Sequence, residues 1–183
     1  MNDWNKKVLR KAKRSAVVAN TLAYMGSLMT FLVDGAETNG RFALMEYEAK
    51  VGNEPPPHVH ERENETLYIL EGEIEAYQGD AVLKLGPGDC LFTPMGEPHA
   101  WYILTPKLRI LIMVEPAFSD RYFREMGQPT GGMSLPSGQS TYAQSDPQHA
   151  IAVAKKYGVK ILTPEETRDA LPKYPGFGAN RSK

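Results

Sequence analysis

The sequence predicts an all-β barrel or sandwich that is followed by short helices. From about residue 22 to residue 114, short apolar or alternating runs are separated by Gly, Pro, Asn and Asp, a texture typical of a compact all-β unit. The 183 residues fit one domain with some decoration and are enough to bury a core. We find no internal repeat, which favours one barrel over a duplicated pair.

Each expected strand is a short run bounded by turn residues. Gly72 is placed where a positive φ would turn one strand into the next. The segment Gly86-Pro87-Gly88-Asp89 predicts a second tight turn, because proline fixes φ and glycine tolerates positive values. Strands are expected at residues 27–33, 42–48, 66–71, 74–77, 81–85, 90–93, 99–104 and 108–115.

Helix signals begin after the last expected strand. Residues 119–126 start with a polar cap and continue with helix formers. A second helix is expected from about Pro147 to Tyr157, with Asp146 as its cap and Gly158 at its end. The segment Thr163-Pro-Glu-Glu166 has the same capped start, which predicts a third short helix to about residue 170.

The remaining segments divide the chain into three parts. Residues 127–146 are rich in Gly, Ser, Pro, Gln and Thr and predict a linker or a mobile loop, and the last dozen residues predict a loose tail. We therefore expect an N-terminal extension (1–26), a barrel (27–116), and a C-terminal helical and loop extension that packs on the barrel (117–183).

Composition argues against several classes of function. A net charge of −1 gives no footprint for nucleic acid, although basic residues gather between Lys6 and Arg14, where they suggest a solvated helix face. This cluster and the stretch from residue 15 to 33 could be taken for a signal peptide or a membrane anchor. We reject that interpretation because the stretch is interrupted by Asn20, Thr21, Tyr24, Gly26, Ser27 and Thr30.

The single cysteine, Cys90, excludes an internal disulfide. It lies in the apolar run Cys90-Leu91-Phe92, which predicts a buried and inert thiol. These features favour a cytoplasmic protein that binds neither nucleic acid nor a membrane.

Three of the four histidines fall in two short segments bounded by glycines, Gly52–Gly72 and Gly88–His99. Because side chains alternate across a strand, His58 and His60 project from one face and can approach the same ion. Glu65 and His99 would complete a set of three nitrogens and one oxygen. The alternative is a scatter of surface histidines on a polar loop. A site with such ligands and open positions accepts Ni, Mn, Fe, Co, Cu or Zn, and it favours catalysis over a structural role.

The spacing of these residues resembles the two motifs of the cupin superfamily. The second motif departs at Ile103, where the family usually has asparagine, a residue that is not a ligand. The resemblance implies a jelly-roll β-barrel, also called a double-stranded β-helix. From about residue 27 to 127 the chain further resembles small cupins similar to quercetin 2,3-dioxygenase, in the segments 40–46, 55–60, 67–72 and 115–127.

What the resemblance implies about function is specific. His58, His60, Glu65 and His99 would bind one divalent transition metal, and Glu65 would also act as the base toward a substrate hydroxyl. The reaction would be dioxygen-dependent cleavage of an enolisable, flavonol-like aromatic or a 1,3-dicarbonyl compound. A metal-assisted isomerase or lyase, and a non-catalytic small-molecule-binding or sensor cupin, remain as alternatives. No helix-turn-helix pattern is evident upstream of Ser27, which argues against a sensor with an attached DNA-binding segment.

An apolar pocket for a flat ligand is expected beside the metal. The aromatic and methionine side chains expected near the barrel mouth are Phe31, Tyr47, Tyr68, Trp101, Met113, Phe118 and Phe123. Each of them could instead fill the core. Tyr68 lies three residues beyond Glu65, so strand parity would direct its ring to the opposite face. Phe118, Phe123 and Met126 could form a lid. Exposed barrel edges favour a homodimer.

Overall fold

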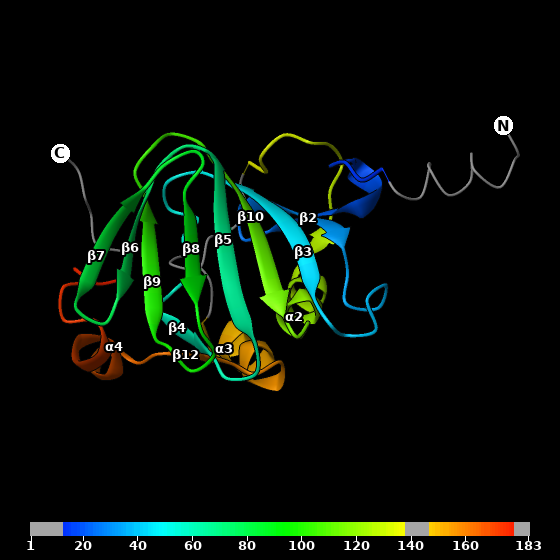
Figure 1. Cartoon of the computed structure of the whole chain (residues 1–183). Helices are drawn as coiled ribbons and strands as arrows, with labels where there is room; N and C mark the ends of the chain where they lie inside the picture. Colours follow the sequence, from blue (N-terminus) through cyan, green and yellow to red (C-terminus); the bar gives the residue numbers. More distant parts are fainter. Residues whose placement is uncertain (1–12, 138–146, 178–183) are drawn as a thin grey trace, which may run out of the picture.

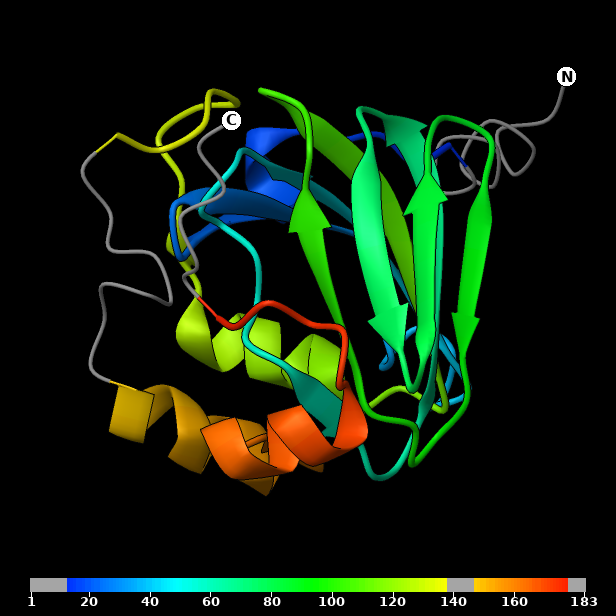
Figure 2. The ribbon, with the colours of Figure 1, turned by 90° about the vertical axis from the view of Figure 1, so that its left-hand side faces the viewer.

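The computed structural model of the chain describes residues 13–137 and 147–177. In this part, two antiparallel sheets face each other and enclose the core, and the helices gather at one end of the sheets (Figure 1, Figure 2). The predicted all-β jelly roll with short helices after it is confirmed.

The larger sheet has seven strands in the order β11-β1-β2-β3-β10-β5-β8. Their bounds are β1 Thr21–Tyr24, β2 Ser27–Val33, β3 Ala43–Ala49, β5 Asn64–Glu71, β8 Cys90–Thr93, β10 Leu108–Glu115 and β11 Gln128–Pro129. The second sheet has five strands in the order β12-β4-β9-β6-β7. These are β4 His58–His60, β6 Ile74–Gln78, β7 Ala81–Leu85, β9 His99–Ile103 and β12 Val159–Ile161.

Every strand expected from the sequence is present, with differences of at most two residues at the ends. β4 was implied by the spacing of His58 and His60 but was not among the expected ranges. The sequence did not predict β1, β11 and β12 as strands. Each of them lies outside residues 27–116 and pairs with another strand of the two sheets: β1 with β2, β11 with β1, and β12 with β4. The sheets thus recruit segments from both extensions, while the three-part division of the chain stays a prediction.

Alternating burial along the strands places the core between the sheets. Along β3 the odd-numbered residues from Ala43 to Ala49 are buried and the intervening ones are half-exposed. Met29, Met45, Ile69 and Ile110 are completely inaccessible to solvent. This alternation removes the apolar side chains on one face of each strand from water. The resulting hydrophobic effect is the main force that stabilises two packed sheets.

The expectation of a buried Cys90 is wrong, because its thiol side chain is exposed. Burial alternates along β8, so that Leu91 and Thr93 face inward while Cys90 and Phe92 face outward. An apolar run of three residues on a strand that is buried on one face must expose some of them.

Three α-helices follow β10 in the described part of the chain. They are α2 Ser119–Met126, α3 Pro147–Lys156 and α4 Pro164–Ala170, and a 3₁₀ turn, η1, covers Val18–Asn20. The start of α4 is a capping box: Thr163 Oγ1 accepts from the N–H of Glu166, whose carboxylate accepts from the N–H of Thr163. The expected cap of α3, Asp146, lies outside the described residues. No helix that the structure describes is long and apolar enough to cross a membrane.

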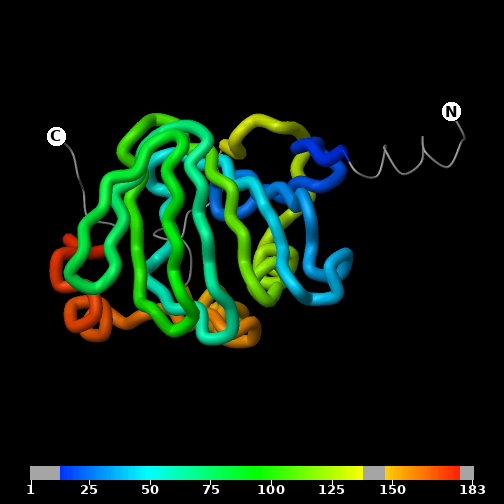
Figure 3. Tube along the Cα trace, in the orientation of Figure 1, coloured from blue at the N-terminus to red at the C-terminus, as the bar shows by residue number. Residues whose placement is uncertain are grey.

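The segment after α4 packs against the smaller sheet (Figure 3). Leu171 and Tyr174 are buried with Tyr77, Ala100 and Tyr102, and the rings of Tyr102 and Tyr174 stack with centroids 5.0 Å apart. The expectation of a loose tail for the last dozen residues is therefore wrong at Tyr174, and residues 178–183 lie outside the described part. Most of the N-terminal basic cluster also lies outside it.

Candidate metal centre

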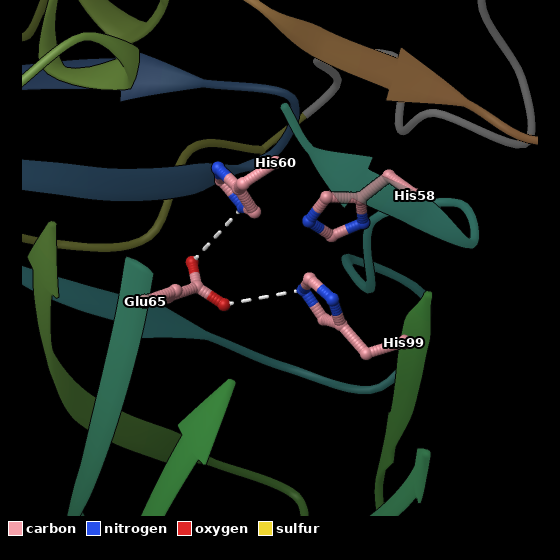
Figure 4. Close-up of side chains that lie close together, drawn as sticks. All are labelled: His58, His60, Glu65 and His99. Atoms are coloured by element: carbon pink, nitrogen blue, oxygen red, sulfur yellow. Dashed lines mark ion pairs between the residues drawn. The ribbon is translucent and has the colours of Figure 1, made fainter. Parts of the chain in front are cut away.

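The three motif histidines and Glu65 lie together between the two sheets (Figure 4). His58 and His60 come from β4, His99 comes from β9, and Glu65 comes from the start of β5 in the other sheet. All four side chains are buried, and their ligand atoms lie within 4.8 Å of one another. The structure thus brings together the whole set that the sequence singled out.

The strand that carries two of these histidines is held on both edges. On one side His58 is paired with His99 of β9. On the other side β12 pairs antiparallel with β4, so that Val159 lies opposite His60 and Ile161 opposite His58. The carbonyl of His60 also accepts from the N–H of Gly96, at 2.8 Å. This three-residue strand therefore has a fixed register, which sets the directions of both imidazoles.

Each histidine contacts an acceptor through its Nδ1. His58 Nδ1 lies 2.8 Å from the carbonyl oxygen of Pro56, and His99 Nδ1 lies 3.1 Å from that of Glu97. Carbonyl oxygens only accept, so in the neutral rings Nδ1 carries the proton and donates, which leaves the lone pair on Nε2. His60 Nδ1 likewise lies 2.6 Å from Glu63 Oε1.

The atoms that face the centre of the cluster lack ordinary hydrogen bonds. His60 Nε2, His99 Nε2 and Glu65 Oε2 are buried without a hydrogen-bond partner within the described ranges. Glu65 forms two longer ion-pair contacts, 3.6 Å to His60 Nε2 and 3.3 Å to His99 Nε2. Buried polar atoms are normally satisfied, so atoms that converge without partners point to a bound group.

The surroundings of the cluster shift the pKa values of His58, His60 and Glu65. Burial, together with the neighbouring His99 and His60, lowers the pKa of His58 well below its usual value. Burial also lowers the pKa of His60, but Glu65 and Glu63 raise it by more, so it lies above its usual value. Burial raises the pKa of Glu65, and the surrounding histidines outweigh this effect and lower it to about 2. Glu65 is therefore an anion at neutral pH.

This donor set fits a first-row divalent metal ion. Three imidazole nitrogens with free lone pairs and one ionised carboxylate converge from three strands. Imidazole and carboxylate together suit Zn, Fe, Mn, Co, Ni and Cu, with bonds of about 2.0–2.2 Å for zinc. Four protein ligands leave room in a five- or six-coordinate ion for one or two further ligands.

A largely apolar cavity opens beside the four residues. It holds about 620 Å³ of space, part of which is open to solvent. His58, His60 and Glu65 form one part of its wall. The other lining residues are Tyr24, Met29, Tyr47, Pro55, Pro56, Leu67, Trp101, Ile112, Ser119, Tyr122, Phe123, Ala154, Val159 and Ile161.

Of the seven side chains expected to form a pocket, Tyr47, Trp101 and Phe123 line this cavity. The other four lie outside its lining. Tyr68 and Met113 are on the outer face of the larger sheet, with exposed fractions of 42% and 36%, as strand parity requires for Tyr68. Phe31 is buried in the core beneath the guanidinium of Arg124, and the half-buried Phe118 lies near the guanidinium groups of Arg62 and Arg121.

Apart from Phe123, sequence reasoning missed the lining that comes from outside the central barrel. Tyr24 belongs to β1, Tyr122 to α2 and Ala154 to α3, and β12 contributes two further side chains. The hydroxyls of Tyr24 and Tyr122 lie 3.0 Å apart. No motif marks these residues, because their position depends on how distant segments fold back over the cavity.

Comparisons with known proteins agree with this fold. The family described as the cupin domain matches residues 45–114. Quercetin 2,3-dioxygenase of Bacillus subtilis is 28% identical over 99 residues, which cover 54% of this chain and 29% of that protein, so the chain spans less than a third of that relative's length.

Among solved structures, an RmlC-like cupin from Shewanella frigidimarina superposes with a TM-score of 0.50 at 18% identity, covering 60% of this chain and 96% of the other. KdgF from a Halomonas species gives a TM-score of 0.48 at 19% identity, covering 61% and 93%. With its two facing antiparallel sheets and the residues of both metal motifs gathered in one buried cluster, this chain is a member of the cupin superfamily.

Proposed function

We propose that this cupin is a metal-dependent dioxygenase that cleaves an enolisable, flavonol-like aromatic or a 1,3-dicarbonyl compound with dioxygen. The observation that carries the proposal is the shared wall: His58, His60 and Glu65 form part of the lining of the apolar cavity. A small organic molecule in the cavity would lie directly against the ligand set. The Bacillus subtilis relative, named as a quercetin 2,3-dioxygenase, supports the same reaction class.

The metal held by His58, His60, Glu65 and His99 would supply Lewis-acid stabilisation of a deprotonated, electron-rich substrate. The lining supports a neutral and flat compound. None of the described lining residues is Lys or Arg, so outside the metal-site histidines the lining has no basic side chain to bind a carboxylate or phosphate. The rings of Tyr47 and Trp101 meet edge to face, with centroids 6.3 Å apart, and present apolar surface that excludes water.

In this proposal, Glu65 accepts the substrate proton. It is ionised at neutral pH, and its carboxylate borders the cavity. A pKa of about 2 makes it a weak base, so it suits a hydroxyl that is itself acidic, such as an enol, better than an ordinary alcohol. The ionisation of Glu65 therefore favours an enolisable substrate.

The test combines elemental analysis of the purified protein with measurement of dioxygen consumption. A flavonol and a 1,3-diketone are offered separately, and the exposed His149 supplies a matched control variant, His149→Ala, against His58→Ala. Bound first-row metal and substrate-dependent uptake that His58→Ala alone abolishes would support the proposal. Substrate conversion without uptake would instead indicate a metal-assisted isomerase or lyase. Metal with neither conversion nor uptake would indicate a binding cupin.

A homodimer is also proposed, on the evidence of the sheet edges. β7 ends the smaller sheet, pairs only with β6 in the described part of the chain, and exposes Val82 and Leu83. Such edges are normally covered or paired. Sedimentation equilibrium at twice the mass of the chain would support the dimer, and the mass of one chain would refute it.

A further inference from the structure

Glu63 connects the candidate metal centre to helix α2 without belonging to the ligand set. Its side chain is almost fully buried, with 1% of its surface exposed. Glu63 Oε1 lies 2.6 Å from His60 Nδ1. Glu63 Oε2 accepts from the backbone N–H groups of Phe118, at 2.9 Å, and Ser119, at 3.0 Å, where α2 begins.

The division of these contacts determines which nitrogen of His60 can bind a metal. A backbone N–H can only donate, so Oε2 is committed to Phe118 and Ser119 as an acceptor. Oε1 is also an acceptor, and it holds the proton of a neutral His60 on Nδ1. The lone pair then resides on Nε2, which points into the cluster.

We propose that Glu63 is a positioning residue that holds His60 in its metal-binding tautomer and ties it to the first turn of α2. That turn matters for the cavity, because Ser119, Tyr122 and Phe123 of α2 line it. One buried carboxylate thus joins the metal ligands to the wall that α2 contributes. The inference rests on the metal site of the proposed function.

The substitution Glu63→Gln would reverse this arrangement. The glutamine side chain has a single acceptor oxygen and a donating amide, and the two backbone N–H groups require the oxygen. The amide would then face His60 Nδ1 and donate to it, which moves the imidazole proton to Nε2 and blocks metal binding. Glu63→Ala imposes neither tautomer on His60. It does leave His60 Nδ1 and the N–H groups of Phe118 and Ser119 without their acceptor. The proposal therefore predicts that Glu63→Gln weakens metal binding more than Glu63→Ala does.

A purely structural role for Glu63 predicts the opposite order, because glutamine fills the site better than alanine. Glu54 provides a matched control for the loss of a buried carboxylate. It is also buried, and its two oxygens accept from the N–H groups of Ile103, at 3.0 Å, and Gly52, at 2.7 Å. Among the described residues, Glu54 forms no hydrogen bond or ion pair with a histidine.

The first experiment measures Zn²⁺ affinity by chelator competition for the wild type, Glu63→Gln, Glu63→Ala and Glu54→Gln. We expect Glu63→Gln to lose about 10- to 100-fold in affinity, as for other partners of metal-bound histidines. Glu63→Ala should lose less although it unfolds at the lowest temperature, and Glu54→Gln should keep the wild-type affinity. Wild-type affinity in Glu63→Gln, an equal loss in Glu54→Gln, or weaker binding by Glu63→Ala would overturn the inference.

The second experiment needs no metal, so it separates this inference from the proposed function. The chain has four histidines, and the ring ¹⁵N shifts of each report its tautomer. At about pH 9, well above the usual pKa of an imidazole, we expect His60 to carry its proton on Nδ1 in the wild type and on Nε2 in Glu63→Gln. An Nδ1–H tautomer in both proteins refutes the inference even if Zn²⁺ binds normally. A wild type that binds no Zn²⁺ refutes the proposed function, while the ring shifts still decide the tautomer.

Amide hydrogen exchange tests the link to α2. The N–H groups of Phe118 and Ser119 should exchange faster in Glu63→Ala than in the wild type. The N–H of Gly127, which donates to the carbonyl of Phe123 at the other end of α2, serves as the internal reference. Unchanged exchange of Phe118 and Ser119 would overturn the connection.

Discussion

His58 and His99 are directly opposed residues of the antiparallel strands β4 and β9, with ring centroids 4.3 Å apart. Opposed residues in such a pair share one face of the sheet. A slip of one residue in this register would turn one of the two rings to the other face. The ligand set thus depends on the pairing of two strands that are distant in the sequence.

Substitution of either opposed histidine should remove the metal without unfolding the barrel. His58→Ala or His99→Ala deletes one of four converging donors, so we expect no stoichiometric metal in elemental analysis and an unchanged far-ultraviolet circular dichroism spectrum. The exposed His149 on α3 is the control, and His149→Ala should keep its metal. A full equivalent of metal in His58→Ala would remove that residue from the ligand set.

Glu65→Gln should separate metal binding from turnover. The amide keeps an oxygen donor but loses the charge, and it cannot take up the substrate proton. We expect the variant to retain much of its metal and to lose at least about 100-fold in the rate of dioxygen uptake, the low end of general-base contributions. Wild-type turnover with bound metal would show that Glu65 is not the base.

Metal affinity should fall as the pH is lowered from about 8 to about 6. Burial lowers the pKa of His60, but Glu65 and Glu63 raise it by more, so in the metal-free protein His60 binds a proton more readily than a free imidazole does. Metal and proton therefore compete for His60 as the pH falls. His58, whose pKa burial lowers, and the ionised Glu65 have no proton to release.

Titration calorimetry with Zn²⁺ in two buffers of different ionisation enthalpy counts the protons released. We expect His60 to release protons when the metal binds, so that the binding enthalpy differs between the two buffers. A binding enthalpy that is the same in both buffers would contradict this assignment.

The exposed thiol of Cys90 should react with a thiol reagent in the folded protein, at one equivalent per chain. Because the side chain faces outward from β8, Cys90→Ser should change the free energy of unfolding by no more than about 0.5 kcal/mol and should not affect turnover. A thiol that reacts only after denaturation, or a large loss of stability, would place the side chain inside the protein.

Phe123→Ala should impair substrate use more than Tyr68→Ala. Phe123 lines the cavity, whereas Tyr68 is 42% exposed on the outer face of the larger sheet. Removal of an apolar contact from a ligand site costs about 1–3 kcal/mol, which predicts a rise in KM of about tenfold or more for Phe123→Ala. Steady-state kinetics of both variants decide the point, and an equal effect of Tyr68→Ala would argue against this cavity as the substrate site.

The strands of the central barrel could be predicted because the apolar residues of their inner faces alternate with polar ones within each short segment. β2, β7, β8 and β10 have the bounds expected from alternating apolar residues and flanking glycines. The ligand set could be predicted for a related reason, since imidazoles two residues apart on a strand must share a face. The motif resemblance then linked His99, from a distant strand, to this pair.

The features that the sequence did not reveal depend on contacts between distant segments. Glu63 lies among charged residues in a turn, where the sequence suggests a solvated side chain. In the structure it is buried and accepts from two N–H groups at the start of α2. β12 is a three-residue strand without flanking strand signals, and its partner β4 lies far away in the sequence. The misassigned burial of Cys90 arose because a short apolar run does not reveal its parity.

The pairing of β12 with β4 also orders events in time. A ribosome releases the chain from its N-terminus, so His58 and His60 emerge well before Val159 to Ile161, the segment that flanks them in the finished sheet. Until β12 has been made, the edge of β4 that β12 will occupy has no neighbouring strand. The strand that carries His58 and His60 therefore gains its second neighbour only after all four ligand residues have been made, and metal loading is expected to follow the pairing of β12 with β4.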